Sequence, residues 1–351
     1  MSPARRKRSF GLLFVVTALL AGAIGYWGFN RYLGFADAPL AGLHPGRTLL
    51  VEPGDSLPAV LRKLDAVGAS NVEKLQWQAL ARQLGAAGRL QVGEYALDPG
   101  ITPRVLLQRM RDGKVVSHRF TIVEGWNIHE LRAALARTPL LEHETTGLDA
   151  AALMKSLGHA GQHPEGRFLP ETYVFTRGDS DRDVLERAYA DMQKALDAAW
   201  TSRAAELPLK SKDEALALAS VVEKETGIAH ERPAIAGVFV RRLKLGMKLQ
   251  TDPTVIYGMG ANYAGNIRKA DLLADTPYNT YTRIGLPPTP IAMPGVAALQ
   301  AATHPATGDA LYFVALGDGS GRHAFTGSLA EHEAAVRNYI QRYRQQQRKP
   351  Q

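Results

Sequence analysis

The segment from Ser211 to Thr226, SKDEALALASVVEKET, most constrains how this chain can fold. Ser211 followed three residues later by Glu214 is a capping box, Ala and Leu fill the interior, and Gly227 supplies a stop, so one well-defined helix is predicted. At about 100° per residue, three apolar side chains and one carboxyl group share a narrow stripe of this helix. These residues are Leu218, Val221, Val222 and Glu225. Glu225 is therefore expected to point where the core residues point.

A carboxyl group at that position has unusual chemistry. Apolar surroundings and the negative C-terminal end of the helix dipole both disfavour the ionised form, so the pKa of Glu225 is expected to rise. A raised pKa is what a general acid needs near neutral pH. The alternative is a last-turn carboxylate that bends out to water. Glu223 and Lys224 lie off the stripe and are expected to be solvated.

The N-terminus indicates where the protein resides. After the basic residues 5–8 comes Phe10 to Phe29, about twenty residues without a charge, long enough to cross a hydrocarbon core of about 30 Å. Positive charge before the span predicts that residues 1–9 lie in the cytoplasm and that everything after the span lies outside the cytoplasm. The alternative is a cleaved signal peptide, because residues 21–23 (AGA) resemble a cleavage site. A single-pass anchor is favoured because the apolar character continues past that site.

Composition excludes several function classes. Of the 42 basic residues, four lie at 5–8 and four between 342 and 349. The remaining 34 basic residues balance the 34 acidic residues in number. No basic patch is therefore implied, and nucleic-acid binding is not expected. The absence of cysteine removes disulfides, thiol catalysis and cysteine-ligated zinc. No HExxH, P-loop, dinucleotide fingerprint or G-x-S-x-G elbow occurs, and His304 and His323 are isolated. Neither a cofactor nor a metal is expected.

A small module is predicted between residues 47 and 114, after a linker over residues 30–46. Its pattern predicts a strand, two helices, a return strand and a further helix. This order resembles a LysM-like wall-binding module. A spacer domain that orients the part that follows explains the pattern equally well.

Three stretches in the rest of the chain have the character of loops that contact a ligand. Residues 165–173 and 278–281 combine rings with hydrogen-bonding side chains, a composition that suits a saccharide groove. Turn chemistry explains the Gly and Pro of the first stretch equally well. Residues 249–252 are short and polar before a proline, as in many substrate-facing loops. The helix expected over 232–245 carries Arg241, Arg242 and Lys244 on or near one side.

Several long motifs, in this order and at this spacing, resemble those of the MltG-type endolytic murein transglycosylases, also called the YceG-like family. They are LASVVEKET, LQTDPTVIYGMG, YNTY, GLPPTPIAMPG and the HPA that begins at His304. The resemblance covers roughly residues 124–343, and the membrane anchor and the LysM-like module agree with the layout of the family. Arg167 and Leu169 depart from it, because aromatic residues are expected there.

The resemblance implies a mixed α+β lytic transglycosylase domain over residues 115–345, with helices around the catalytic glutamate and small sheets, and a tail over 346–351. It implies cleavage of the β-1,4 bond between N-acetylmuramic acid and N-acetylglucosamine within nascent glycan strands, leaving a 1,6-anhydro end. The catalytic glutamate of the family matches Glu225. Peptidoglycan synthases are the implied partners, which would let the enzyme terminate strand elongation.

Around Glu225 a set of polar and aromatic residues is expected to bind the sugar. Gln250, Thr251 and Asp252 are expected to position the sugar or the attacking hydroxyl, and the other candidates are expected to line the groove or contribute to it. These others are Tyr278, Asn279, Tyr281, Glu165 and Glu171.

Two alternatives to the transglycosylase stay open. The first is a hydrolytic muramidase, in which Asp252, Glu171 or Glu165 serves as base or nucleophile. The second is a non-catalytic scaffold of the cell-wall synthesis machinery, although an intact Glu225 on an apolar face argues against it.

Overall fold

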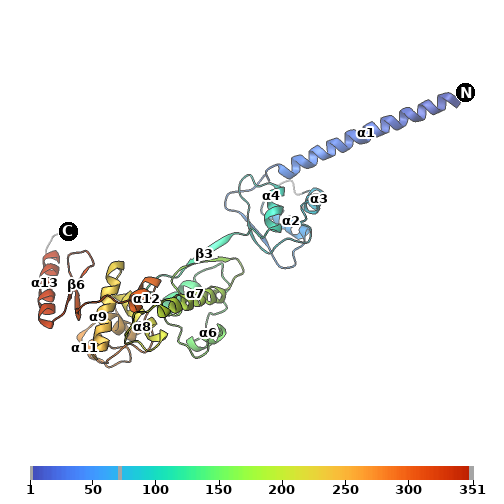
Figure 1. Cartoon of the computed structure of the whole chain (residues 1–351). Coiled ribbons are helices and arrows are strands. Elements are labelled where there is room, and N and C mark those ends of the chain that lie inside the picture. The colour runs from blue at the N-terminus through green and yellow to red at the C-terminus, as the bar shows by residue number, and fades with distance from the viewer. Residues whose placement is uncertain (1–2, 70–72, 348–351) are drawn as a thin grey trace. The chain divides into compact units, whose positions relative to one another are not determined.

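The computed structural model describes residues 3–69 and 73–347, and the side chains of residues 14–69 and 73–345. The chain divides into two compact units, Met1–His118 with Thr176–Gly178, and Arg119–Phe175 with Asp179–Gln351. Within the described residues, the strands form three two-stranded sheets, β1-β2, β3-β4 and β5-β6, among many more helices (Figure 1). The architecture is mixed α+β, as the resemblance implied.

The first unit is built around one antiparallel pair of strands. Thr48 of β1 lies opposite Ala96 of β2, and the large side chains of Trp77 and Tyr95 are fully buried in its core. A strand, two helices and a return strand follow one another as the pattern predicted. The elements of this unit are α1 (Pro3–Asp37), β1 (Thr48–Val51), α2 (Leu57–Ala66), α3 (Lys74–Gln83), β2 (Gly93–Ala96), α4 (Pro103–Arg111) and the start of β3 (Ser117–Thr121).

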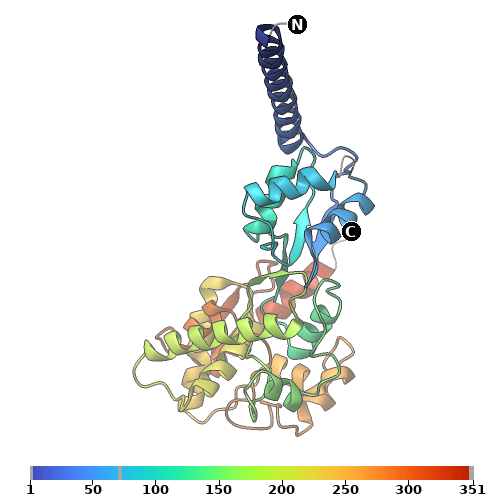
Figure 2. The same cartoon turned by 90° about the vertical axis from the view of Figure 1, so that its right-hand side faces the viewer.

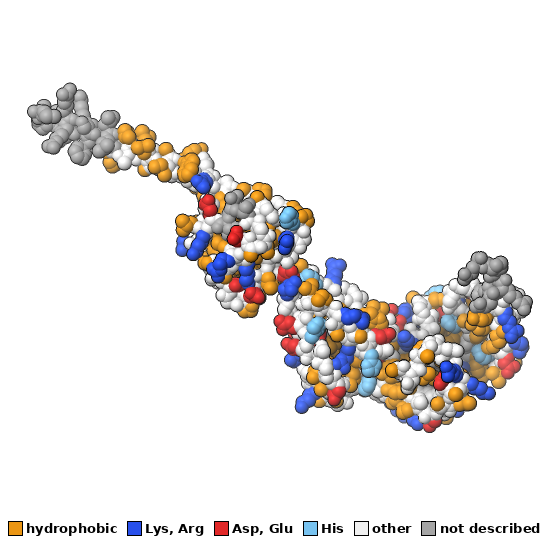
Figure 3. All heavy atoms as spheres, turned by 180° about the vertical axis from the view of Figure 1, so that it is seen from behind, with side chains coloured by type: hydrophobic (Ala, Val, Ile, Leu, Met, Phe, Trp, Pro, Cys, Tyr) orange, Lys and Arg blue, Asp and Glu red, His pale blue; other side chains and the backbone are white. Residues whose placement is uncertain are grey.

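Helix α1 is one continuous helix that reaches Asp37. The first part of the expected linker is thus helical, and Ala36 and Leu40 are buried in the core of the first unit, because their apolar side chains pack there. Hydrophobic side chains are exposed along α1 from Phe14 to Phe29 (Figure 3). The membrane span is expected at residues 10–29, and the side chains of its first four residues, 10–13, lie outside the described part of the chain. In the described part of the chain, no helix combines the length and the apolar character needed to cross a membrane.

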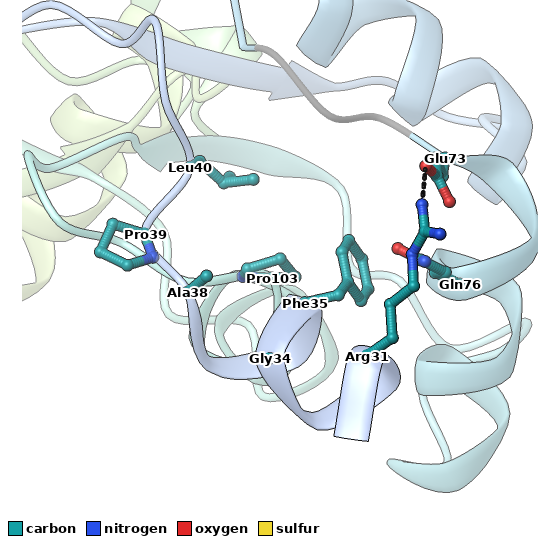
Figure 4. A pocket seen from close by; sticks show the side chains of 9 residues that line it. All are labelled: Arg31, Gly34, Phe35, Ala38, Pro39, Leu40, Glu73, Gln76 and Pro103. Atoms are coloured by element: carbon teal, nitrogen blue, oxygen red, sulfur yellow. Dashed lines mark ion pairs between the residues drawn. The ribbon is translucent and has the colours of Figure 1, made fainter. Parts of the chain in front are cut away.

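A cavity of about 300 Å³ lies where the end of α1 meets α3 and the start of α4 (Figure 4). Phe35, in the last turn of α1, and Leu40, in the chain that follows, both point into it. Arg31 forms an ion pair with Glu73 at its edge, with 3.5 Å between the charged groups. Phe35 also packs edge-on against Trp77, with 5.8 Å between the ring centroids, so the end of α1 is fixed to the core.

The second unit places helix α8 among four others. Helix α8 packs against α7, α9, α10 and α12 (Figure 2), and its residues from Ala215 to Val222 are buried. The elements of this unit are the rest of β3, α5 (Ile128–Ala136), α6 (Ala150–Ser156), β4 (Thr172–Thr176), α7 (Asp181–Thr201), α8 (Lys212–Glu225), η1 (Ala229–Glu231), α9 (Arg232–Lys244), α10 (Asp252–Met259), η2 (Gly260–Asn262), α11 (Lys269–Leu273), α12 (Val296–Thr303), β5 (Tyr312–Ala315), β6 (His323–Thr326) and α13 (Leu329–Gln347).

The start of α8 follows the predicted cap with one difference. The hydroxyl of Ser211 accepts a hydrogen bond from the Glu214 amide, 3.2 Å away, as in a capping box. The Glu214 carboxylate, however, accepts from the amide of Lys210 at 2.6 Å, one residue earlier than the motif requires. The helix then ends at Glu225, since Thr226 is extended.

The loop that begins at Glu165 requires glycine at its second residue. Gly166 has φ of 76°, in the left-handed region that L side chains avoid. A Cβ atom there would lie 2.5 Å from the Cβ of Pro290, so a side chain would also clash with the loop that contains Pro290. Glycine thus lets these two loops pack together.

Candidate active site

Glu225 is the last residue of α8, where the helix leaves the core. Leu218, Val221 and Val222, which share its stripe, are fully buried, as predicted from the helical pattern. The Glu225 side chain is partly buried, and Oε1 accepts a hydrogen bond from the Thr251 hydroxyl. Burial is the main cause that raises the pKa of Glu225, and the bond from Thr251 opposes this rise. Glu225 therefore favours the protonated state of a general acid.

Thr251 is held in place by the loop that precedes α10. Its amide donates to the hydroxyl of Thr280, 3.1 Å away, and its carbonyl accepts from the hydroxyl of Thr254 at 2.7 Å. The preceding residue, Gln250, has φ of 50°, a strained conformation for a side chain other than glycine. Buried hydrogen bonds thus hold the strained turn that presents Thr251 to Glu225.

Asp252 supplies the second carboxyl group of the site. It begins α10 and is exposed, and its Oδ1 accepts a hydrogen bond of 2.6 Å from the Tyr281 hydroxyl. Its negative charge raises the pKa of Glu225 further. Two carboxyl groups in one cavity are a common arrangement in acid-base sites.

These residues line one open cavity of about 470 Å³. One side carries Glu225 with Gln250, Thr251, Asp252 and Tyr281. The remaining lining comes from α9, the loop after it, β5 and α13, and consists of Arg242, Leu249, Tyr312, Phe313, Val314, Leu329, His332 and Val336. Rings and aliphatic side chains beside a few polar groups suit the faces and hydroxyls of a sugar.

Other predicted groove residues support the cavity without lining it. Asn279 is buried, and its side-chain amide donates to the carbonyls of Asp271, Leu272 and Ala274, so it organises the loop. The Tyr278 hydroxyl lies 2.9 Å from that of Thr289.

The two glutamates of the stretch 165–173 lie away from this cavity. Glu171 is exposed, and its carboxylate accepts from the amide of the next residue. Glu165 is fully buried, where its carboxylate accepts from the Ile128 amide and from the Tyr257 hydroxyl at 3.0 to 3.1 Å. Burial raises the pKa of Glu165 to about 7.

Glu223 corrects one expectation about α8. Only 5% of its side chain is exposed, whereas the helical pattern predicted a solvated residue. It forms an ion pair with Arg232, 2.9 Å away, and accepts from the Gly295 amide at 3.0 Å. The reason is tertiary: α9 and the loop before α12 cover the face of α8 that the pattern left polar. Lys224 is exposed, as expected.

His323 is a residue near the site that its position in the sequence did not reveal. Its Nδ1 lies 2.8 Å from the buried carboxylate of Glu231, which also accepts from the His323 amide at 3.0 Å. His323 in its protonated form opposes the rise of the pKa of Glu225. His304 lies elsewhere, with Nε2 2.6 Å from the Ser202 carbonyl.

The structure is thus a mixed α+β protein with an open cavity lined by a carboxyl group of raised pKa and by aromatic side chains. The chain belongs to the YceG-like family, whose profile matches residues 49–338.

Similar proteins bear names that agree with this site. An endolytic murein transglycosylase of Bacillus subtilis (strain 168) is 30% identical over 302 residues, 81% of each chain. An endolytic murein transglycosylase of Streptococcus pneumoniae (strain D39) is 26% identical over 370 aligned positions, 95% of this chain and 65% of that protein. A crystal structure of a yceG-like protein from Listeria monocytogenes is 27% identical and superposes with a TM-score of 0.50 over 82% of this chain and 98% of that one.

Proposed function

We propose that the protein is an endolytic lytic transglycosylase that cleaves the β-1,4 bond between N-acetylmuramic acid and N-acetylglucosamine within glycan strands. The observation that carries this function is Glu225, whose pKa is raised by burial and which Thr251 holds at the wall of an aromatic-lined cavity. Membership of the YceG-like family and the names of the relatives support the same function.

The mechanism uses one carboxyl group twice. Neutral Glu225 gives its proton to the glycosidic oxygen as the bond to C1 breaks and an oxocarbenium-like transition state develops. The resulting carboxylate takes the proton of the muramoyl C6 hydroxyl, whose oxygen attacks C1 and closes the 1,6-anhydro ring. Glu225 is then protonated again, and no water is consumed.

The other side chains of the cavity have assigned roles in this mechanism. Thr251 orients the carboxyl group of Glu225, and Asp252 places negative charge where positive charge develops on the sugar. Gln250 and Tyr281 border the same space and contact the sugar hydroxyls.

A hydrolytic muramidase is a second candidate, favoured by a second carboxyl group, that of Asp252, in the same cavity as Glu225. In that reaction, Asp252 would act as the base for a water molecule or as the nucleophile, and the product would carry a reducing end. Glu165 is buried and Glu171 lies away from the cavity, so neither is placed for that role.

Mass spectrometry of purified murein tests the function. The full chain in detergent is incubated with murein beside its Glu225→Gln variant. Anhydromuramoyl ends from the parent alone support the transglycosylase, and reducing ends support the muramidase. If neither protein yields products, the proposed function fails for the isolated chain, as expected of a scaffold or of an enzyme that needs a partner.

We further propose that α1 anchors the protein in the inner membrane as a single-pass segment, with residues 1–9 in the cytoplasm and the rest in the periplasm. The apolar side chains exposed along α1 support this placement. Alkaline extraction of membranes tests it, because an anchored protein stays in the pellet.

We also propose that the first unit is a LysM-like wall-binding module, and that peptidoglycan synthases are the partners that supply nascent strands. Its strand, helix, helix, strand order supports the module. Co-purification after crosslinking in intact cells tests the partners, and recovery without any synthase would count against them.

A further inference from the structure

Arg242 is a buried cation whose guanidinium is fixed by the backbone. It lies on α9, and only 7% of the residue is exposed. Its Nε donates to the carbonyl of Leu311 at 2.7 Å, and its Nη1 donates to the carbonyl of Leu249 at 2.7 Å and to that of Lys248 at 3.3 Å. The guanidinium also lies over the ring of Tyr312, 5.2 Å from the centroid. Its plane is thus held between the entry to β5 and the loop that carries Thr251.

This anchoring uses Nε and Nη1 of the guanidinium. Arg242 lines the same cavity as Glu225, and Nη2 makes no hydrogen bond with any residue that the structure describes. Arg242 also forms no ion pair within 4.0 Å among the described residues, Glu225 included. A guanidinium bound directly to Glu225 would favour its carboxylate and remove the general acid. The cation is therefore available to a ligand.

We propose, on the basis of the function proposed above, that Arg242 is a substrate-binding residue that donates from Nη2 to an acyl oxygen of the sugar bound beside Glu225. Carbonyl and carboxylate oxygens are the partners that a guanidinium binds best. In murein, such oxygens belong to the acetamido groups of both sugars and to the lactyl group of the muramoyl residue. An anchored donor would orient the ring relative to Glu225 and would select N-acylated or lactylated sugars over plain ones.

The neighbouring Arg241 provides a matched control. Its Nε donates to the carbonyl of Ala310 at 2.6 Å and its Nη1 to that of Ala306 at 3.1 Å, so it anchors the same approach to β5. It does not line the cavity. Loss of Arg241 therefore removes comparable backbone hydrogen bonds and leaves the cavity intact.

The experiment compares Arg242→Lys and Arg241→Lys in the full chain carrying Glu225→Gln, so that the ligand is bound but not cleaved. Calorimetry measures affinity for murein glycan fragments and for chitin oligosaccharides, which lack the lactyl group. Arg242→Lys is expected to weaken binding at least about tenfold, because a charge-assisted hydrogen bond is lost, whereas Arg241→Lys stays within about twofold. Thermal unfolding checks every variant first, and Arg242→Gln replaces Arg242→Lys if that variant does not fold.

The two ligands identify the oxygen. If the Arg242 variant binds both glycans more weakly, the acetamido carbonyl is the acceptor. If it binds only the murein fragments more weakly, the lactyl group is the acceptor. Equal affinity in parent and Arg242 variants, an equal loss in Arg241→Lys, or no glycan binding at all would overturn the inference. Arg242-dependent binding by a chain that yields no cleavage products would refute only the proposed reaction.

Discussion

The hydroxyl of Thr251 donates to the carboxyl group of Glu225, although the two residues stand 26 positions apart in the sequence. Glu225 ends α8 and Thr251 immediately precedes α10, so the bond joins the end of one helix to the start of another. Thr251 is buried and fixed by Thr280 and Thr254. The position of the Glu225 carboxyl group thus depends on a network of three threonines.

Glu225→Gln is expected to lower the rate of glycan cleavage by about 10³-fold or more, because the amide cannot transfer a proton. Anhydromuramoyl ends released per minute measure the loss. Circular dichroism and thermal unfolding should match the parent, since Gln fills the same space and accepts from Thr251. Residual activity near that of the parent would assign the acid to another residue.

Thr251→Val is expected to move the pH dependence of kcat/KM upward. The acid works when protonated, so the rate falls as the pH rises through the pKa of Glu225, and the Thr251 bond lowers that pKa. Without the bond, the alkaline limb shifts to higher pH, and the plateau falls about threefold to tenfold as the carboxyl group loses its orientation. Thr251→Ser should restore both the alkaline limb and the plateau of the pH profile. If the alkaline limb of the valine variant does not move, the hydrogen bond from Thr251 does not set the pKa of Glu225.

Asp252→Asn is expected to shift the alkaline limb of the pH dependence of kcat/KM to lower pH. The charge of Asp252 raises the pKa of Glu225, so its removal lowers that pKa and the rate falls at lower pH. Tyr281→Phe is the matched control, because it removes the 2.6 Å hydrogen bond to Asp252 and keeps the charge. A shift toward higher pH in Asp252→Asn would refute this electrostatic coupling.

Glu223→Ala is expected to lower the free energy of unfolding by about 3–5 kcal/mol, because it leaves the buried guanidinium of Arg232 without its main partner. Urea unfolding followed by tryptophan fluorescence measures the change. The double variant Glu223→Leu with Arg232→Met should recover most of the loss, because no buried charge remains. Equal losses in the single and double variants would show that packing, not charge, is responsible.

Glu165→Gln is expected to flatten the pH dependence of stability. Burial raises the pKa of Glu165 from 4.5 to about 7, so the folded state binds its proton more tightly than the unfolded state. The resulting stabilisation is complete below about pH 4.5 and is lost as the pH rises to about 7, a change of about 3 kcal/mol at most. Urea unfolding at pH 5 and pH 8 checks this, and a parent whose stability does not fall between them would contradict the shift.

Much of the local structure could be predicted from the sequence. Helix α9 runs from Arg232 to Lys244, as the pattern over 232–245 predicted. Helix α8 likewise begins directly after Ser211, the predicted cap. Helix α10 was missed because the short polar stretch before it and the proline in its first turn both indicate a loop.

The helix that carries Glu225 follows from local sequence alone, since the spacing of Leu218, Val221 and Val222 fixes which face is buried whatever packs against it. The motifs that identify the family are also local. Tertiary packing set the rest of the cavity lining, the buried pair of Glu223 with Arg232 and the anchoring of Arg242. Each of these joins residues from separate elements, and local periodicity carries no information about which elements meet.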